Sequence, residues 1–396
     1  MKKYLYLVIF GVILDSNLLG VIISFASSFS LGLLFRKFKL PTILAYIFAG
    51  ILLSNNTLAV INVKIINDVS ILNLLSSFSL MFLLMITGIK FPLSKIWKYA
   101  NTAFIVAMIE VFFSVSMMYL LCYYLFRFSA LDSAMISVSL APSSVIILNR
   151  IIQEKKLARE IFIYIVLAIS MVENVMFGIL ITILVILIST PFTYVSLATQ
   201  ISLITLFTGL LLLGGSYAFP ILFNKIAKED ETMNFILIVV LSFTIAYIGS
   251  YIMMNPYSSI LLTSIAISSI KTIQKIEENL KFIEEIILAI FYFYVGYTLN
   301  IWQVQIHQIL LIVVLLYFSK ILSSYFSMRT IGYDKKVALN TSTSIILPGE
   351  LSLILAFIAV YSFGLSSNIL NYVIIIIIIN YIFQYLINKL IYSKIS

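Results

Sequence analysis

The chain has 396 residues, of which 62% are hydrophobic and only 10% are charged, whereas charged residues make up about a quarter of soluble domains. This composition predicts a polytopic membrane protein and excludes a soluble enzyme, a secreted disulfide-linked domain and a receptor with a large ectodomain. A single cysteine, Cys122, and a single histidine, His307, exclude an intrachain disulfide and a cysteine- or histidine-cluster metal centre, and we expect no cofactor.

Apolar stretches recur along the chain almost to its C-terminus. With a window of about 20 residues as a guide, they predict thirteen transmembrane helices: 17–35, 41–54, 68–89, 99–126, 130–148, 160–188, 195–223, 233–253, 256–270, 284–302, 306–328, 335–360 and 366–392. No polar stretch is long enough for a soluble regulatory domain. Residues 1–16, with Lys2 and Lys3 before a short apolar run, are typical of either a signal-like segment or an interfacial helix.

The loops between these helices alternate in charge. One set of loops, with the C-terminal tail, carries twenty Lys and Arg residues, and the opposite set carries only Lys64 and Arg127. Cytoplasmic loops are enriched in Lys and Arg, so we expect the C-terminus in the cytoplasm, the N-terminus outside and a location in the cytoplasmic membrane. The most polar loop, 271–285, predicts an amphipathic cytoplasmic helix. The net charge of +9 therefore reflects topology and does not indicate a nucleic-acid partner.

Thirteen helices divide into six, one and six, and a single linker helix inverts the second group relative to the first. Gly88 in helix three corresponds to Gly296 in helix ten, and Pro142 in helix five corresponds to Pro348 in helix twelve. A proline in mid-membrane frees backbone polar groups that are stable only beside protein or a wet cavity. A single membrane proline is more often a kink, but paired interruptions point to an ion or substrate site.

Four charged residues lie well inside apolar segments: Glu110, Glu173, Lys320 and Glu350. Each costs at least about 3 kcal/mol at the bilayer centre unless it is paired or faces a cavity. They fall on helices four, six, eleven and twelve, whereas helices one to three and eight to ten have none near their centres. We therefore expect a membrane domain, 17–392, made of three parts: an ion-handling core, 99–188 and 306–392, an apolar scaffold, 17–89 and 233–302, and a linker helix, 195–223.

Seven motifs occur in order along the chain: LGLLFRKFKLPTILAYIFAGILL (31–53), LMFLLMITGIKF (80–91), LAPSSVIILNRII (140–152), SMVENVMFGIL (170–180), FYFYVGYTLNI (291–301), FSKILSSYF (318–326) and LPGELSLILA (347–356). Together they resemble the monovalent cation:proton antiporters of the Kef and sodium/proton exchanger superfamily. The resemblance implies an all-α fold of two inverted six-helix repeats, whose interrupted helices cross at an ion site. It also implies a homodimer whose core moves like an elevator.

The chain departs from the family pattern at two motifs. The ion-binding aspartate of the family is the second residue of an Asn-Asp or Asp-Asp pair, whereas the pair here is Glu173-Asn174. The carboxylate is thereby displaced by about 100° around the helix. The Thr-Ser-Pro of the first broken helix is replaced by Pro142-Ser143-Ser144.

Burial and charge assign a role to each polar residue of this region. We expect Glu173 to carry the proton or the cation, because desolvation favours the neutral acid and one carboxylate cannot hold both ions well. The neutral oxygen ligands of the cation would be freed backbone carbonyls and three side chains: Asn174, Ser143 and Ser144.

The other three charges have open roles. Lys320 would balance the acid charge, and Glu350 would either pair with it or anchor the second broken helix. A fixed Glu350–Lys320 pair with no part in transport fits the sequence equally well. Glu110 is the weakest candidate, and we expect it in helix packing or beside a cavity.

These features predict a secondary active transporter, not an enzyme, that exchanges Na⁺ or K⁺ for protons by alternating access. The alternative is a transport-inactive or channel-like relative with the same fold. A symporter of an organic anion would need net positive charge in the core, whereas three acids accompany one lysine here. The sequence leaves open which alkali cation is carried and whether the exchange is electroneutral.

Overall fold

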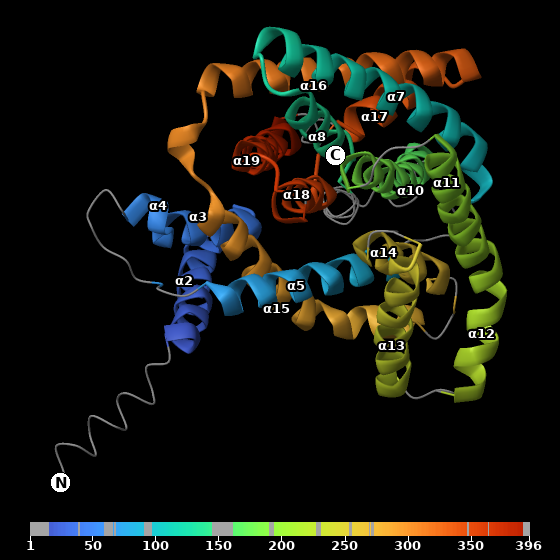
Figure 1. The fold of residues 1–396 in the computed structure, drawn as a ribbon, viewed down its shortest axis with the longest axis horizontal. Helices are drawn as coiled ribbons and strands as arrows, with labels where there is room; N and C mark the ends of the chain where they lie inside the picture. The colour runs from blue at the N-terminus through green and yellow to red at the C-terminus, as the bar shows by residue number, and fades with distance from the viewer. Residues whose placement is uncertain are drawn as a thin grey trace. The chain divides into compact units, whose positions relative to one another are not determined.

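Helices make up all the regular structure of the part of the chain that is described (Figure 1). The computed structural model describes residues 16–38, 40–58, 66, 69–90, 97–144, 161–189, 194–226, 231–252, 256–268, 270, 273–346, 348–362 and 364–390. The predicted all-α fold is confirmed. The N-terminal segment, 1–16, lies outside the described residues except for Ser16.

The helices follow the apolar segments. Their bounds are α2 Ser16–Lys37, α3 Thr42–Leu53, α4 Asn55–Leu58, α5 Ser70–Ile89, α7 Ala100–Leu120, α8 Ala130–Leu140, α10 Ile161–Ser189, α11 Tyr194–Gly209, α12 Gly215–Ile226, α13 Glu231–Ser250, α14 Pro256–Ile267, α15 Ile273–Thr298, α16 Ile306–Ile331, α17 Lys335–Ser344, α18 Glu350–Phe357 and α19 Ser367–Leu390. Short π-helical turns, η3 Leu121–Leu125, η4 Leu210–Gly214 and η6 Ile358–Ser362, continue α7, α11 and α18.

Every predicted apolar range overlaps at least one of these helices. Among the described residues, five helices are long and apolar enough to cross a membrane, or six if the bent pair 201–214 and 217–226 forms one span. The protein is therefore an integral membrane protein with several spans. Thirteen crossings stay a prediction.

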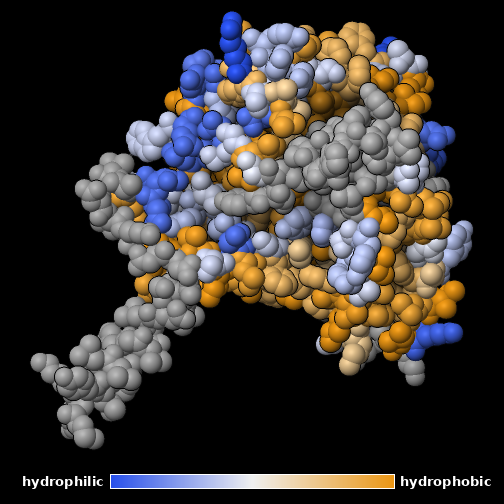
Figure 2. Space-filling model, in the orientation of Figure 1, coloured by the Kyte–Doolittle hydropathy of each residue, from blue (hydrophilic) through white to orange (hydrophobic). Residues whose placement is uncertain are grey.

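The exposed surface of α13 is typical of a lipid-facing helix. After Glu231 at its start, its exposed large side chains are apolar or aromatic: Met233, Ile236, Val240, Tyr247 and Ile248. Figure 2 shows hydrophobic side chains gathered over this region.

The polar segment 271–285 does not form a helix of its own. One continuous helix, α15, runs from Ile273 to Thr298 and joins most of this segment to the apolar segment after it. The junction contains strong helix formers such as Glu, Leu and Ala and has no proline, so nothing interrupts the helix there.

The chain divides into two compact units. The first comprises residues 1–83 and 281–303, and the second comprises residues 84–280 and 304–396. The helices α5 and α15 each contribute residues to both units. The helices that bear the intramembrane charges all belong to the second unit. The predicted division into scaffold, core and linker stays a prediction.

Glycines allow two pairs of helices to pack closely. In the first unit, a Cβ added to Gly296 of α15 would lie 2.0 Å from the carbonyl oxygen of Ile47 in α3. In the second unit, a Cβ added to Gly88 of α5 would lie 2.6 Å from the Cβ of Ser264 in α14. Small residues permit such contacts between membrane helices.

These two contacts join helix ten to helix two and helix three to helix nine. Under the predicted inverted repeat, helix ten corresponds to helix three and helix two to helix nine, so the two contacts are equivalent. Gly88 and Gly296, which correspond in sequence, therefore also have the same packing role.

The predicted helices five and twelve, which contain Pro142 and Pro348, are both interrupted. The helix α8 ends at Leu140, and the described residues after it, 141–144, are not helical. The helix α17 ends at Ser344, and α18 begins at Glu350. The two non-helical segments meet in an isolated antiparallel bridge between Ser143 and Pro348. This agrees with the predicted crossing of interrupted helices.

Replacement of Gly296 by alanine is expected to lower stability by at least about 2 kcal/mol, because the added Cβ would overlap the carbonyl of Ile47. The matched control is Gly209→Ala in α11, where nothing lies within 4 Å of the new Cβ and alanine favours the helix. Thermal unfolding in detergent measures both variants. Equal melting temperatures would contradict the close helix contact.

Candidate functional site

A buried ion pair joins α7 to α16. The Lys320 ammonium lies 3.1 Å from Oε1 of Glu110, and neither side chain is exposed. The two helices run side by side in the second unit (Figure 1). The pairing removes most of the cost of two isolated charges in the membrane. Sequence reasoning ranked Glu110 last and considered Glu350 as the partner of Lys320, but the side chain of Glu350 lies outside the described part of the structure.

Lys320 also contacts both helix interruptions. Its ammonium donates to the carbonyl oxygens of Ala141, at 2.5 Å, and Ile345, at 3.3 Å. These residues directly follow the C-terminal ends of α8 and α17. A helix C-terminus presents free carbonyl groups and a partial negative charge. The Lys320 ammonium therefore offsets the partial negative charge at the C-terminal ends of both α8 and α17.

Local sequence explains why both helices stop at this point. The helix α8 begins where the Ser129 hydroxyl accepts a hydrogen bond from the amide of Asp132, as in a standard N-cap. It ends just before Pro142, and the second interruption contains Pro348. Proline has no backbone N–H and cannot continue a helical hydrogen-bond ladder.

Ser143 links the ion pair to the remaining acid. Its hydroxyl donates to the Ile345 carbonyl at 2.7 Å and accepts from Lys320 at 3.3 Å. Its backbone N–H donates to Oε2 of Glu173 at 2.8 Å. The Ser143 hydroxyl therefore already acts both as a hydrogen-bond donor and as a hydrogen-bond acceptor. Its neighbour Ser144 is also buried, and an added Cβ on Gly349 would lie 2.3 Å from the Ser144 Cβ.

Glu173 is the second buried carboxylate of this cluster. It is fully buried in α10, about 18 Å along the helix from Ile161. Among the described groups, its Oε1 has no hydrogen-bond partner, and neither does the buried hydroxyl of Ser170 one turn earlier. Asn174 follows Glu173 in the helix, but its side chain lies outside the described residues.

The structure therefore brings together six of the predicted site residues in one cluster: Glu173, Ser143, Lys320, Pro142, Pro348 and Glu110. It identifies the carbonyls of Ala141 and Ile345 as the backbone groups beside them. A signal for Glu110 was present in the sequence, because helix four corresponds to helix eleven in the repeat. An acid and a base on equivalent helices are placed to meet near the symmetry axis of the two repeats.

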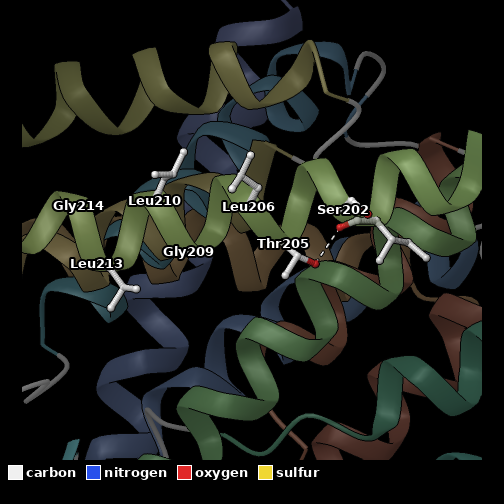
Figure 3. A pocket seen from close by; sticks show the side chains of 8 residues that line it. Ser202, Thr205, Leu206, Gly209, Leu210, Leu213 and Gly214 are labelled. Atoms are coloured by element: carbon white, nitrogen blue, oxygen red, sulfur yellow. Dashed lines mark hydrogen bonds between the residues drawn. The ribbon is translucent and has the colours of Figure 1, made fainter.

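A separate cavity lies along α11 and η4. It has a volume of about 640 Å³ and is lined by Ile201, Ser202, Thr205, Leu206, Gly209, Leu210, Leu213 and Gly214. Figure 3 shows that these residues follow one another along a single stretch of helix. Its polar lining is limited to two hydroxyls, and none of the cluster residues contributes to it. We therefore do not assign ion binding to this cavity.

The chain resembles known ion exchangers in sequence and in fold. The sequence profile of one family, described as sodium/hydrogen exchanger, transmembrane, matches residues 21–391. The chain belongs to the sodium/hydrogen exchanger family. This confirms the resemblance to the cation:proton antiporter superfamily and places the protein in a family of transporters. No curated protein sequence matches the chain.

Two solved structures of an exchanger share this fold. Both are of the sodium proton antiporter MjNhaP1 from Methanocaldococcus jannaschii. The structure at pH 8 superposes with a TM-score of 0.67 at 12% identity, over 99% of this chain and 97% of MjNhaP1. An electron-microscopy structure gives a TM-score of 0.63 at 12% identity, over 93% and 94%. At this identity the likeness establishes the exchanger fold.

A double-mutant cycle tests whether Glu110 and Lys320 stabilise the folded protein as an ion pair. Glu110→Gln and Lys320→Met should each lower the unfolding free energy by about 3–5 kcal/mol, because each leaves one buried charge without its partner. The double variant should lose clearly less than the sum of the two. The measurement is unfolding in detergent. Strictly additive losses would mean that the two side chains do not interact in the folded protein.

Proposed function

We propose that this protein exchanges Na⁺ or K⁺ for protons across the cytoplasmic membrane by alternating access. One observation carries the proposal: Glu173 is a fully buried carboxylate held beside the crossing of two interrupted helices, and one of its oxygens has no hydrogen-bond partner among the described groups. Membership of the sodium/hydrogen exchanger family supports cation:proton exchange. K⁺ is retained because nothing in the cluster distinguishes the two ions.

The chemistry follows from the two oxygens of Glu173. Oε2 accepts a hydrogen bond from the amide of Ser143, which holds the carboxylate in place. Oε1 is available to take either a proton or a cation. Desolvation favours protonation, and an incoming cation favours the charged form. Competition between the proton and the cation for the Glu173 carboxylate is therefore enough to couple their movements in opposite directions.

The residues near Glu173 in the sequence or in the cluster have different proposed roles. Asn174 and Ser144 are the proposed neutral ligands of the cation. Ser143 is better described as a positioning residue, because both functions of its hydroxyl are engaged. Lys320 and Glu110 compensate each other, and Glu350 at the start of α18 is proposed to anchor the second broken helix.

The proposal extends to organisation in the membrane. Residues 99–188 and 306–392 would form the moving core, residues 17–89 and 233–302 the scaffold, and residues 195–223 the linker, within a homodimer. The distribution of basic loops supports a cytoplasmic C-terminus, an external N-terminus and the plasma membrane.

A transport-inactive or channel-like relative is the second candidate function. The observation that favours it is the displaced acid in Glu173-Asn174. The two candidates differ in proteoliposomes that contain a pH-sensitive dye. An exchanger releases the proton gradient when Na⁺ or K⁺ is added to the outside, whereas an inactive relative leaves the gradient unchanged with every cation. Adding Li⁺, Na⁺ and K⁺ in turn identifies the substrate.

Glu173→Gln is expected to abolish cation-coupled proton movement, because it removes the titratable charge and keeps nearly the same volume. Glu173→Asp should keep some exchange at a reduced rate, since the charge stays but the shorter side chain loses contact with the Ser143 amide. The control is Asp334→Asn, which removes an exposed carboxylate outside the cluster. The cation-driven proton flux of all three variants is measured with the pH-sensitive dye in proteoliposomes of equal protein density. Wild-type exchange by Glu173→Gln would refute the carrier role.

A further inference from the structure

Four oxygens surround the Lys320 ammonium, and they come from three separate parts of the second unit. They are Glu110 Oε1 at 3.1 Å, the Ala141 carbonyl at 2.5 Å, the Ser143 hydroxyl at 3.3 Å and the Ile345 carbonyl at 3.3 Å. One carboxylate, two carbonyls and a hydroxyl are also the ligands that proteins offer to a dehydrated alkali cation.

Two of these oxygens, the Ser143 hydroxyl and the Ile345 carbonyl, are held in place independently of the lysine. The Ser143 hydroxyl donates to the Ile345 carbonyl at 2.7 Å, and Ser143 also pairs with Pro348 across the interruptions. The Ala141 carbonyl directly follows the C-terminus of α8, whose partial negative charge favours a cation. Removal of the lysine side chain would therefore leave at least the Ser143 hydroxyl and the Ile345 carbonyl in place beside Glu110.

Glu110 supplies the charge of this site. It is fully buried, and its second oxygen, Oε2, has no hydrogen-bond partner among the described groups. Without Lys320 the carboxylate would be an uncompensated buried charge. A single negative charge matches a monovalent ion better than a divalent one.

We propose that these four oxygens form a second monovalent-cation site, separate from Glu173, which the Lys320 ammonium fills as a tethered cation. A free ammonium or potassium ion enters this site when the lysine side chain is absent. The spacing of the oxygens suits ammonium, and K⁺ is close to ammonium in size. The smaller Na⁺ is expected to bind less well.

The two sites contact different groups of Ser143. Its amide faces Glu173 and its hydroxyl faces Lys320. While Lys320 occupies the second site, the Ala141 and Ile345 carbonyls are engaged and do not serve a cation at Glu173. This inference concerns binding and stability, so it stands or falls separately from the proposed exchange activity.

The test compares Lys320→Ala with Lys320→Met, both in a Glu173→Gln background that removes the other carboxylate. Alanine opens space for a free ion, whereas methionine fills most of the space of the lysine chain without a charge. The melting temperature is measured in detergent in ammonium, potassium or choline chloride at equal concentration. At saturation, ammonium should raise the melting temperature of the alanine variant by about 5 °C over choline.

The methionine variant and the Glu173→Gln parent should show no such difference between ammonium and choline. Adding Glu110→Gln to the alanine variant should remove most of the effect, because it removes the charge that attracts the ion. Equal shifts in the alanine and methionine variants would overturn the proposal, and so would the absence of a shift. Failure of the alanine variant to fold in both ammonium and choline would also overturn it, since a free cation must be able to replace the tethered one.

Discussion

The desolvation of charge in the membrane is the constraint on which this structure depends. An ammonium group cannot be buried in the bilayer core unless oxygens replace its hydration shell. Lys320 meets this requirement with the Glu110 carboxylate, the Ser143 hydroxyl and two carbonyls at the ends of interrupted helices. The packing of α7 against α16 and the crossing of the two interruptions are thus connected through one side chain.

The same constraint gives the two buried acids of the cluster different roles. Glu110 has a cation at 3.1 Å, and Glu173 has a hydrogen bond from a backbone amide. Glu110 thus has a fixed cationic partner, whereas among the described groups Oε1 of Glu173 has no hydrogen-bond partner. The difference in neighbours, rather than in residue type, is the reason that Glu173 is the proposed carrier.

The inverted repeat places equivalent helices where they can meet. Glu110 and Lys320 lie on helices four and eleven, Pro142 and Pro348 lie on helices five and twelve, and each pair is in contact or close to contact. The glycine contacts of α3 with α15 and of α5 with α14 follow the same correspondence. A pseudo-twofold relation explains why complementary features recur at the same position in the two halves of the chain.

The sequence by itself determined the membrane class, the all-helical fold, the apolar segments and both interruptions. It also identified Glu173 and Lys320, because hydropathy, proline and intramembrane charge act locally and can be read along the chain. Only the tertiary structure decided that Glu110 pairs with Lys320, that Ser143 connects this pair to Glu173, and that the carbonyls of Ala141 and Ile345 face the ammonium. These contacts join residues 30 or more positions apart in almost every case, and their choice depends on which faces of the helices meet. Periodicity specifies that an acid is buried, but the packing of α7, α8, α10, α16 and α17 specifies which cation or amide lies beside it.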